Sequence, residues 1–155
     1  MKYKVEKILD GYSICFRQWE ATHSHCHYLH GYAIYFKLYF EAEKLDSYSW
    51  VWDFAWMKNP DNKINGLQVK EWFSYMFDHT VIVAQDDPEL AEFKRLDEQG
   101  VIQLRTLPVL SCERIADYVL NQVGKLVSEQ TEGRVMLRRV DVFEHNKNCA
   151  SAEID

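Results

Sequence analysis

The segment Gly31–Ala42 constrains the fold more than any other stretch of this chain, because large apolar residues occupy every second position in it (Ile34, Phe36, Leu38, Phe40). A period of two places these side chains on one face of an extended strand. Continued backwards, the same period places His30 and Tyr32 on the apolar face. We therefore expect a half-buried β-strand with His30 at its entrance, beside the core.

The other segments predict a mixture of strands and helices. Tyr12–Ala21 has the composition of a strand, and a polar loop joins it to Gly31–Ala42, so we expect the two to be antiparallel neighbours. Helical spacing and end signals predict three helices, which are Leu67–Phe77, Glu89–Gln99 and a segment that begins after Ser111. Further short strands are predicted at Val101–Leu107, Val135–Glu144 and Ala150–Ile154. This order is typical of an α+β fold, with helices on one face of an antiparallel sheet.

Length and composition exclude several classes of protein. The 155 residues, of which 47% are apolar, suit a single folded domain over residues 1–155. The net charge of -6 and the scattered basic residues argue against a nucleic-acid partner. No apolar run reaches the roughly 20 residues of a membrane span, and the first residues lack the apolar region of a signal peptide. Four widely spaced cysteines suggest no disulfide framework, so a reducing cytoplasm is expected.

The segment Trp19–Tyr32 gathers most of the potential metal ligands of the chain. Within eight residues it holds four imidazoles and one thiol (His23, His25, Cys26, His27, His30). Zinc takes imidazole and thiolate ligands, and a catalytic zinc keeps one position open for substrate. The alternative is a polar surface loop that is rich in histidine. The paired Cys-x2-Cys spacing of a zinc finger is absent.

Four other positions could carry chemistry, and each has a plainer explanation. Asp78–His79 follows a predicted helix, where a carboxylate could orient an imidazole for acid–base work, or where the helix dipole simply favours a histidine. Cys26 could be a nucleophile or base, a metal ligand or an inert thiol. Glu113 could be no more than a helix-start charge. Glu144, near the end of a strand, would need donors from a ligand if buried, and would have no role if exposed.

In chain order, these pieces resemble the family of 6-pyruvoyltetrahydropterin synthase and 6-carboxytetrahydropterin synthase. That family carries an aromatic-x-Ala-x-His segment, a Cys-x3-His-Gly-His segment, Val-x-Asp-Phe, an Asp-His after a helix, a Thr-x-Glu that opens a later helix, and a glutamate that ends a late strand. The matching residues here are Trp19–His23, Cys26–Tyr32, Val51–Phe54, Asp78–His79, Ser111–Glu113 and Glu144. The ordered set covers nearly the whole chain.

The resemblance implies a tunnelling fold, in which a four-stranded antiparallel sheet has its helices between the second and third strands. It implies a homo-oligomer, a trimer or hexamer, with sites between subunits. By analogy, Zn²⁺ polarises the hydroxyl-bearing side chain of a pterin substrate and Cys26 moves protons there as thiolate. Asp78 and His79 would form the second acid–base group. Glu144, helped by Glu113, would hold the pterin ring.

Three departures from the family pattern bear on the site. The last histidine of His-Gly-His is Tyr32, two extra residues (Val109, Leu110) precede the Ser-Cys-Glu segment, and only two residues separate His23 from Cys26. A neutral phenol is a poor zinc ligand. We therefore expect Tyr32 to line the pocket and to bond a substrate hydroxyl.

The loop holds more imidazoles than the family pattern requires, so the metal site is expected to keep three of them. The expected set is His23, His25 and His30, with His27 as the alternate. Residues two apart share a face of an extended strand, so His23 and His25 could both point at one ion.

These expectations lead to one function and two alternatives. The sequence predicts a zinc-dependent 6-carboxytetrahydropterin synthase-like lyase that acts on 7,8-dihydroneopterin triphosphate, in 7-deazaguanine (queuosine-type) biosynthesis. The first alternative is 6-pyruvoyltetrahydropterin synthase activity on the same substrate. The second is a non-catalytic homologue that binds a pterin or purine, which Tyr32 favours because it stands in a ligand position.

Overall fold

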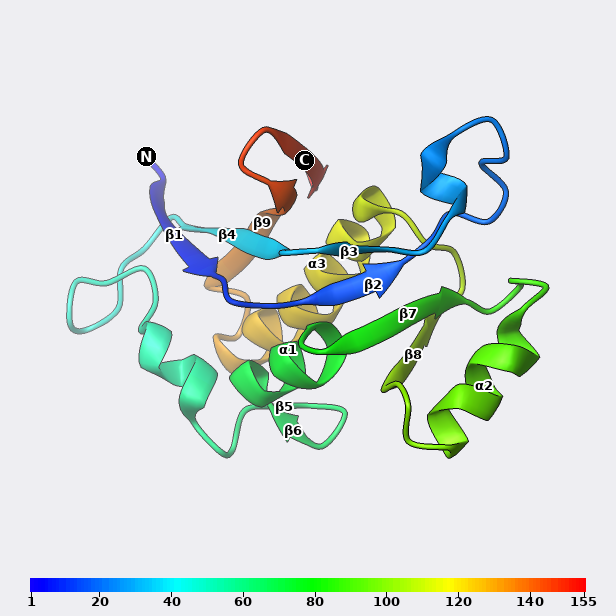
Figure 1. Cartoon of the computed structure of the whole chain (residues 1–155). Helices are drawn as coiled ribbons and strands as arrows, with labels where there is room; N and C mark the ends of the chain where they lie inside the picture. Colours follow the sequence, from blue (N-terminus) through cyan, green and yellow to red (C-terminus); the bar gives the residue numbers. More distant parts are fainter.

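Two four-stranded sheets and three α-helices make up the structure, a computed structural model that describes residues 1–155 (Figure 1). The first sheet is antiparallel throughout, and its strands in spatial order are β1 (Tyr3–Leu9), β4 (Tyr35–Ala42), β9 (Val135–His145) and β10 (Asn148–Glu153). The second sheet is mixed, and its strands in spatial order are β3 (His30–Tyr32), β2 (Ile14–Phe16), β7 (Thr80–Ala84) and β8 (Leu104–Leu107). The expected α+β architecture is confirmed.

All three α-helices lie between β4 and β9 in the chain, which are the second and third strands of the first sheet. They are α1 (Val69–Phe77), α2 (Leu90–Glu98) and α3 (Cys112–Gln130). Two 3-10 turns and a small hairpin complete the elements: η1 (His25–His27), η2 (Phe54–Lys58), β5 (Lys63–Ile64) and β6 (Leu67–Gln68). Ser111 caps α3 as predicted, because its Oγ accepts the N–H of Arg114 at 3.1 Å.

The alternation in β4 decides which face of the first sheet is buried. Phe36, Leu38 and Phe40 are at most 1% exposed and belong to the main hydrophobic core with the buried face of α3. On the other face, Lys37 pairs with Glu6 across to β1 at 2.9 Å. The helices therefore cover one face of this sheet and a polar network covers the other, as the period of two predicts.

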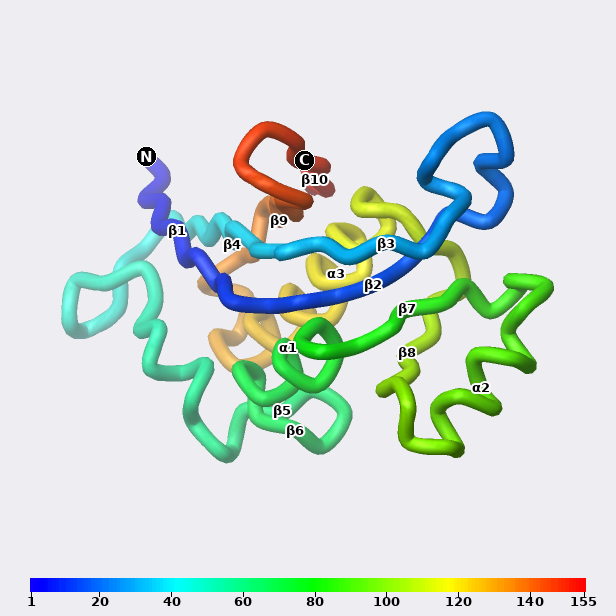
Figure 2. Tube along the Cα trace, in the orientation of Figure 1, coloured from blue at the N-terminus to red at the C-terminus, as the bar shows by residue number.

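The bounds of every predicted strand differ in the structure, and two strands differ most. Tyr12–Ala21 is a strand only over Ile14–Phe16, because the chain turns from Trp19 onwards. Gly31–Ala42 is broken at Ala33–Ile34, where the chain leaves the second sheet as β3 and enters the first as β4; Figure 2 traces this passage. The expected antiparallel pairing holds between β2 and β3, over three residue pairs, but the long partners of β4 are β1 and β9.

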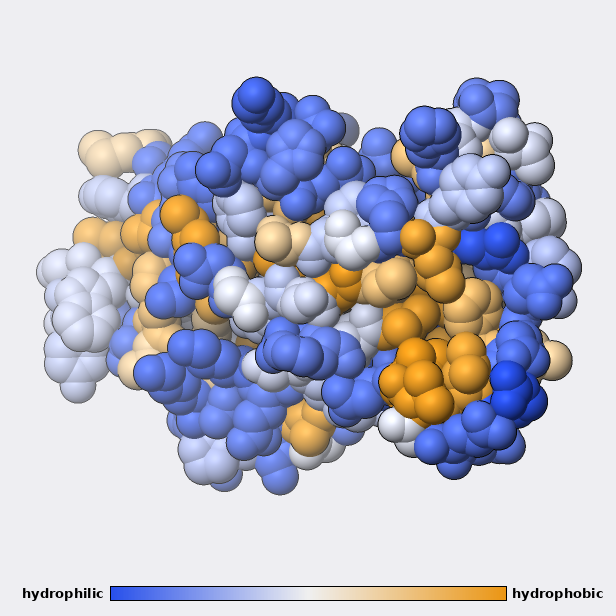
Figure 3. Space-filling view, in the orientation of Figure 1, coloured by the Kyte–Doolittle hydropathy of each residue, from blue (hydrophilic) through white to orange (hydrophobic).

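The surface is mostly polar on the face that Figure 3 shows, with one larger apolar area where Figure 1 draws β8 and α2. Val101 and Val109, on the two connections of β8, are 65% and 55% exposed. None of the helices is both long enough and apolar enough to cross a bilayer.

Candidate functional site

The histidine-rich loop closes on itself between β2 and β3. Ser24 caps the 3-10 turn η1, since its Oγ accepts the N–H of Cys26 at 3.1 Å. The carbonyl of Cys26 in turn accepts the N–H of Gln18 at 2.8 Å. Residues 23–27 are thus a turn and not an extended strand, so the geometric reason for pairing His23 with His25 on one face is wrong.

Two imidazoles of the loop are fixed by backbone carbonyls. Nδ1 of His27 lies 2.8 Å from the carbonyl oxygen of Trp19, and Nδ1 of His30 lies 3.2 Å from that of Tyr28. A carbonyl only accepts hydrogen bonds, so each Nδ1 carries a proton and Nε2 is the ring nitrogen left to face a ligand. Metal-bound histidines are held in the same way.

The remaining predicted ligands do not complete a metal centre in this structure. His23 and His25 are exposed and have no hydrogen bond to their rings. No group of three or more His, Cys, Asp or Glu side chains is placed to hold a metal ion. His30 is also exposed, rather than beside the core as expected, although its ring lies 4.3 Å from the ring of Tyr32. The zinc assignment stays a prediction.

Tyr32 lies at the centre of the candidate site. Its ring stacks on that of Phe16 with the centroids 4.5 Å apart. Burial raises the pKa of Tyr32, and the negative charge of Glu144 raises it further, as do the charged forms of Cys112, Cys26 and Cys15. The phenol is therefore neutral at physiological pH.

Glu144 lies in a hollow of about 380 Å³ beside the start of α3. It follows Val140 and Val142 on the helix-facing side of β9, both of which are fully buried. Its Oε1 accepts a hydrogen bond from Sγ of Cys112, the first residue of α3, at 3.4 Å. The other lining residues come from α3 and from the β9–β10 hairpin: Glu113, Lys147, Asn148, Cys149 and Ala150.

Glu113 opens into the same hollow from the first turn of α3. Its side chain is exposed and lies where the positive end of the helix dipole favours a carboxylate. It makes no ion pair within the chain. The hollow thus presents two carboxylates, which suits a ligand with several N–H donors.

Asp78 and His79 form the second candidate group, at the C-terminal end of α1. Oδ1 of Asp78 lies 2.9 Å from Nδ1 of His79 and also accepts the N–H of Ser13. His79 has φ +55°, in the left-handed region that residues other than glycine adopt rarely. Such backbone strain is concentrated at functional sites. The side chain of His79 is 79% exposed, so a partner could reach it.

The register of the second sheet places Asp78 and His79 nearer to Tyr32 than to His30. Ile14 pairs with both Tyr32 and Thr80, the residue after His79, and Ser13 donates its N–H to Asp78. No hydrogen bond or ion pair joins Asp78 or His79 to Cys26, Tyr32 or Glu144.

A buried ion pair fixes the base of the histidine-rich loop to the β7–α2 connection. Arg17 donates to both carboxylate oxygens of Asp87, at 2.7 and 2.9 Å, and the Asp87 side chain is 1% exposed. Nε1 of Trp19 donates to Asp86 at 3.2 Å. These contacts hold the loop beside a second hollow of about 400 Å³, which Val109 and Leu110 also line.

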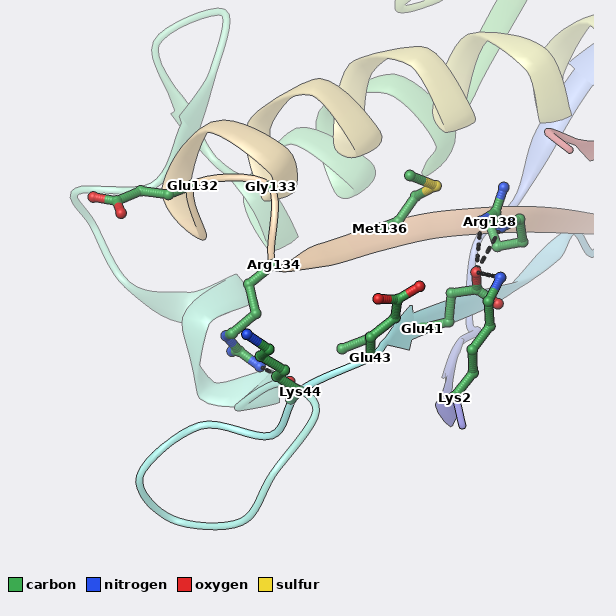
Figure 4. A pocket seen from close by; sticks show the side chains of 10 residues that line it. Lys2, Glu41, Glu43, Lys44, Glu132, Gly133, Arg134, Met136 and Arg138 are labelled. Atoms are coloured by element: carbon green, nitrogen blue, oxygen red, sulfur yellow. Dashed lines mark hydrogen bonds and ion pairs between the residues drawn. The ribbon is translucent and has the colours of Figure 1, made fainter.

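A third hollow, of about 360 Å³, lies at the opposite end of β9 (Figure 4). Two of its basic residues are paired with one carboxylate: Glu41 lies between Arg138 and Lys2, with Nε of Arg138 and Nζ of Lys2 both 3.0 Å away. Met136 on its wall precedes Glu144 by eight residues, roughly 26 Å along a strand. This hollow is therefore separate from the candidate site.

Some residues of the site could not be assigned a role from the sequence. Cys112 entered only as the middle residue of the Ser-Cys-Glu segment, and Lys147 and Asn148 were not singled out. Their one signal is position: Cys112 directly follows a helix cap, Lys147 lies in the turn after β9, and Asn148 begins β10.

Comparison with known proteins identifies the family of this chain. A family model described as 6-pyruvoyl tetrahydropterin synthase matches residues 7–155. A 6-carboxy-5,6,7,8-tetrahydropterin synthase of Rickettsia typhi is 29% identical over 99 residues, and one of Rickettsia felis is 27% identical over 99 residues. In both cases the match spans 63% of this chain and 64% of the relative, which is less than two thirds of its length.

Solved structures show the same fold over the full length. An uncharacterized protein of Wolinella succinogenes superposes with a TM-score of 0.80 at 18% identity, and covers 100% of this chain and 99% of its own. The 6-pyruvoyltetrahydropterin synthase of Plasmodium vivax gives a TM-score of 0.65 at 17% identity, with 99% of both chains covered. The family model spans nearly every residue of the fold and of the candidate site, and this chain therefore belongs to the 6-pyruvoyl tetrahydropterin synthase family.

Proposed function

We propose that this chain, acting as a single pterin-synthase-like domain over residues 1–155, is a zinc-dependent 6-carboxytetrahydropterin synthase-like lyase. Its substrate would be 7,8-dihydroneopterin triphosphate, in 7-deazaguanine (queuosine-type) biosynthesis. The observation that carries the proposal is the hollow at the start of α3, where Glu144 and Glu113 present carboxylate acceptors to one space. The names of the Rickettsia relatives support the carboxy product.

Each residue around Tyr32 has a role that its chemistry supports. Glu144 accepts the ring N–H and amino donors of the pterin, since a carboxylate matches paired N–H donors, and Glu113 adds acceptors from the same hollow. Tyr32 stays protonated and donates a hydrogen bond to a substrate hydroxyl. Cys26, which is half-buried, moves a proton at the substrate side chain.

We propose that Asp78 and His79 act from a second copy of the chain, in a homo-oligomer such as a trimer or hexamer. The 79% exposure of the His79 side chain supports this arrangement. The first sheet ends in two edge strands, β1 and β10, whose outer backbone groups are available for pairing with another copy. Paired with Asp78, the His79 imidazole would be the second acid–base group.

The donor types of the loop fit zinc, although their arrangement in this structure does not gather three of them. The proposed ligands are His23, His25 and His30, with His27 as the alternate. The bonds of His27 and His30 to carbonyl groups support these two, because each leaves Nε2 free. Bound zinc would acidify the substrate oxygens that it contacts.

A reducing cytoplasm is the proposed location, because all four cysteines are free thiols.

Two alternative functions have support of their own. Structural neighbours from Plasmodium vivax and Caenorhabditis elegans carry the name 6-pyruvoyl tetrahydropterin synthase, which favours the pyruvoyl product. Tyr32, which stands in a ligand position of the family pattern, favours a homologue that binds a pterin or purine without turnover.

The test is to incubate the purified protein with 7,8-dihydroneopterin triphosphate, identify the product by mass spectrometry and measure zinc in the same sample. We expect 6-carboxytetrahydropterin and bound zinc. A 6-pyruvoyl product would favour the first alternative. Binding without product would favour the second, and neither binding nor turnover would contradict a pterin function altogether.

A further inference from the structure

The thiol of Cys112 is the only protein group that hydrogen-bonds the Glu144 carboxylate. Cys112 is 6% exposed, and its Sγ lies 3.4 Å from Oε1. Oε2 has no partner within the chain. A carboxylate offers about four acceptor sites, so the thiol takes one of them and leaves acceptors on both oxygens.

Cys112 is a donor in this contact because it keeps its proton. A cysteine at the start of a helix ordinarily has a lowered pKa. Here burial raises the pKa of Cys112, and the charge of Glu144 and the hydrogen bond to it raise the pKa further. At neutral pH the group is therefore a neutral S–H that points at a carboxylate, and not a competing anion.

We infer that Cys112 is a positioning residue, whose S–H fixes the plane of the Glu144 carboxylate so that one acceptor site on each oxygen faces the hollow. The inference rests on the proposed function, in which Glu144 holds the heterocycle. A ligand with two adjacent N–H donors, as in a pterin or a guanine-type ring, then meets two acceptors together. A heterocycle that presents an acceptor at that edge is rejected, because two acceptors face each other.

The position of Cys112 in the fold suits its side chain to this role. As the first residue of α3 it is anchored by the Ser111 cap, and α3 packs along β9, which carries Glu144. The donor and the acceptor thus come from two rigid elements rather than from loops. Without the thiol, Glu144 keeps its place on β9 but loses the contact that fixes its rotation.

The test is a double-mutant cycle on the affinity for 7,8-dihydroneopterin, measured by titration calorimetry. Cys112→Ala should weaken binding about tenfold, as expected for the loss of one hydrogen bond to a charged group. Cys112→Ser should restore affinity to within about threefold of wild type, because it keeps a donor. In a Glu144→Gln background, Cys112→Ala should change affinity little, since its effect passes through the carboxylate.

Two further measurements separate positioning from packing. Ile115→Val removes a methyl group from the next buried position of α3, away from Glu144, and should lower the melting temperature without changing affinity. The S–H stretching band of Cys112, identified by its loss in Cys112→Ala, should move to higher wavenumber in Glu144→Gln as the hydrogen bond weakens.

The outcomes keep the two proposals apart. If the wild type does not bind dihydroneopterin, the proposed function fails and the inference fails with it. If the wild type binds, Glu144→Gln weakens binding, and Cys112→Ala equals wild type, only the role of Cys112 is overturned. Additive effects of the two substitutions would also overturn it.

Discussion

Replacing Glu144 by glutamine tests the heterocycle anchor with the smallest change of shape. The amide has nearly the volume of the carboxylate, so the buried strand face that carries Val140 and Val142 need not repack. The charge is lost, and one acceptor oxygen becomes an NH₂ donor. In the wild type Cys112 is the only protein donor to these oxygens, so the substitution should act mainly on the hydrogen bonds to the ligand.

The expected magnitude follows from the number of bonds affected. Hydrogen bonds to a charged group contribute roughly 1.5–3 kcal/mol each. With glutamine, one of the two hydrogen bonds to the ligand is lost, and the other is weaker because the charge is gone. The side-chain NH₂ of glutamine also faces an N–H donor of the ligand, and two donors repel each other. We expect a loss of about 3–4 kcal/mol, which is roughly 100- to 1,000-fold in Kd.

The assay is calorimetric titration with 7,8-dihydroneopterin, accompanied by thermal unfolding to show that the fold is intact. Glu129→Gln, at the exposed far end of α3, is the matched control and should leave the Kd unchanged. Glu113→Gln, in the same hollow but exposed, should weaken binding by less than Glu144→Gln. A change below about fivefold in Glu144→Gln, in a folded protein, would refute the anchor.

Three other predictions follow from the site and its supports. Cys26→Ala should reduce turnover by roughly 10²–10⁴-fold while zinc content and assembly stay as in wild type; loss of zinc with activity would make Cys26 a ligand instead. His30→Ala should lower the zinc content measured by mass spectrometry, whereas Tyr32→Phe and the control His145→Ala should not; full zinc in His30→Ala, or loss in Tyr32→Phe, would contradict the ligand assignment. Asp87→Asn should lower the free energy of unfolding by about 3 kcal/mol, because it leaves the buried Arg17 unpaired, and a loss below 1 kcal/mol in a denaturant titration would argue against a stabilising pair. Burial raises the pKa of Asp87, but its hydrogen bonds to Arg17 and to the N–H of Glu89 bring the net pKa below the ordinary value, so in wild type this stabilisation is present above a pH of about 4 and is lost as the pH falls further.

The sequence predicted those elements whose signal is local. The alternation in β4, the cap of α3 and the helical spacing in α1 depend on neighbouring residues, and each element formed close to its predicted place. β7 was not identified, because a threonine and four consecutive apolar residues after a helix do not show a period that separates strand from helix. β1 was not identified either, since its place in the sheet is set by pairing with β4 rather than by its own composition.

The sequence could predict which residues belong to the site, but not how they are arranged in space. Glu144 is far from Cys26 and Tyr32 in the chain, and only the passage from β3 to β4 and the pairing of β4 with β9 bring its strand toward them. The contact between Cys112 and Glu144 spans 32 residues and has no motif of its own. The distance from Asp78 to the loop depends on the parallel register of β2 and β7, which composition does not encode.

The place of β9 in the first sheet has a consequence for how the chain folds during synthesis. β4 lies between β1 and β9, so one of its edges stays open until the ribosome has released residues 135–145. For most of translation the nascent chain carries a strand with one unpaired edge and with Phe36, Leu38 and Phe40 on one face. Nascent chains can associate wrongly along such an edge. Nascent chains that stall before residue 135 should therefore need a chaperone or aggregate, and the completed protein should reach its native state only after its last strands emerge.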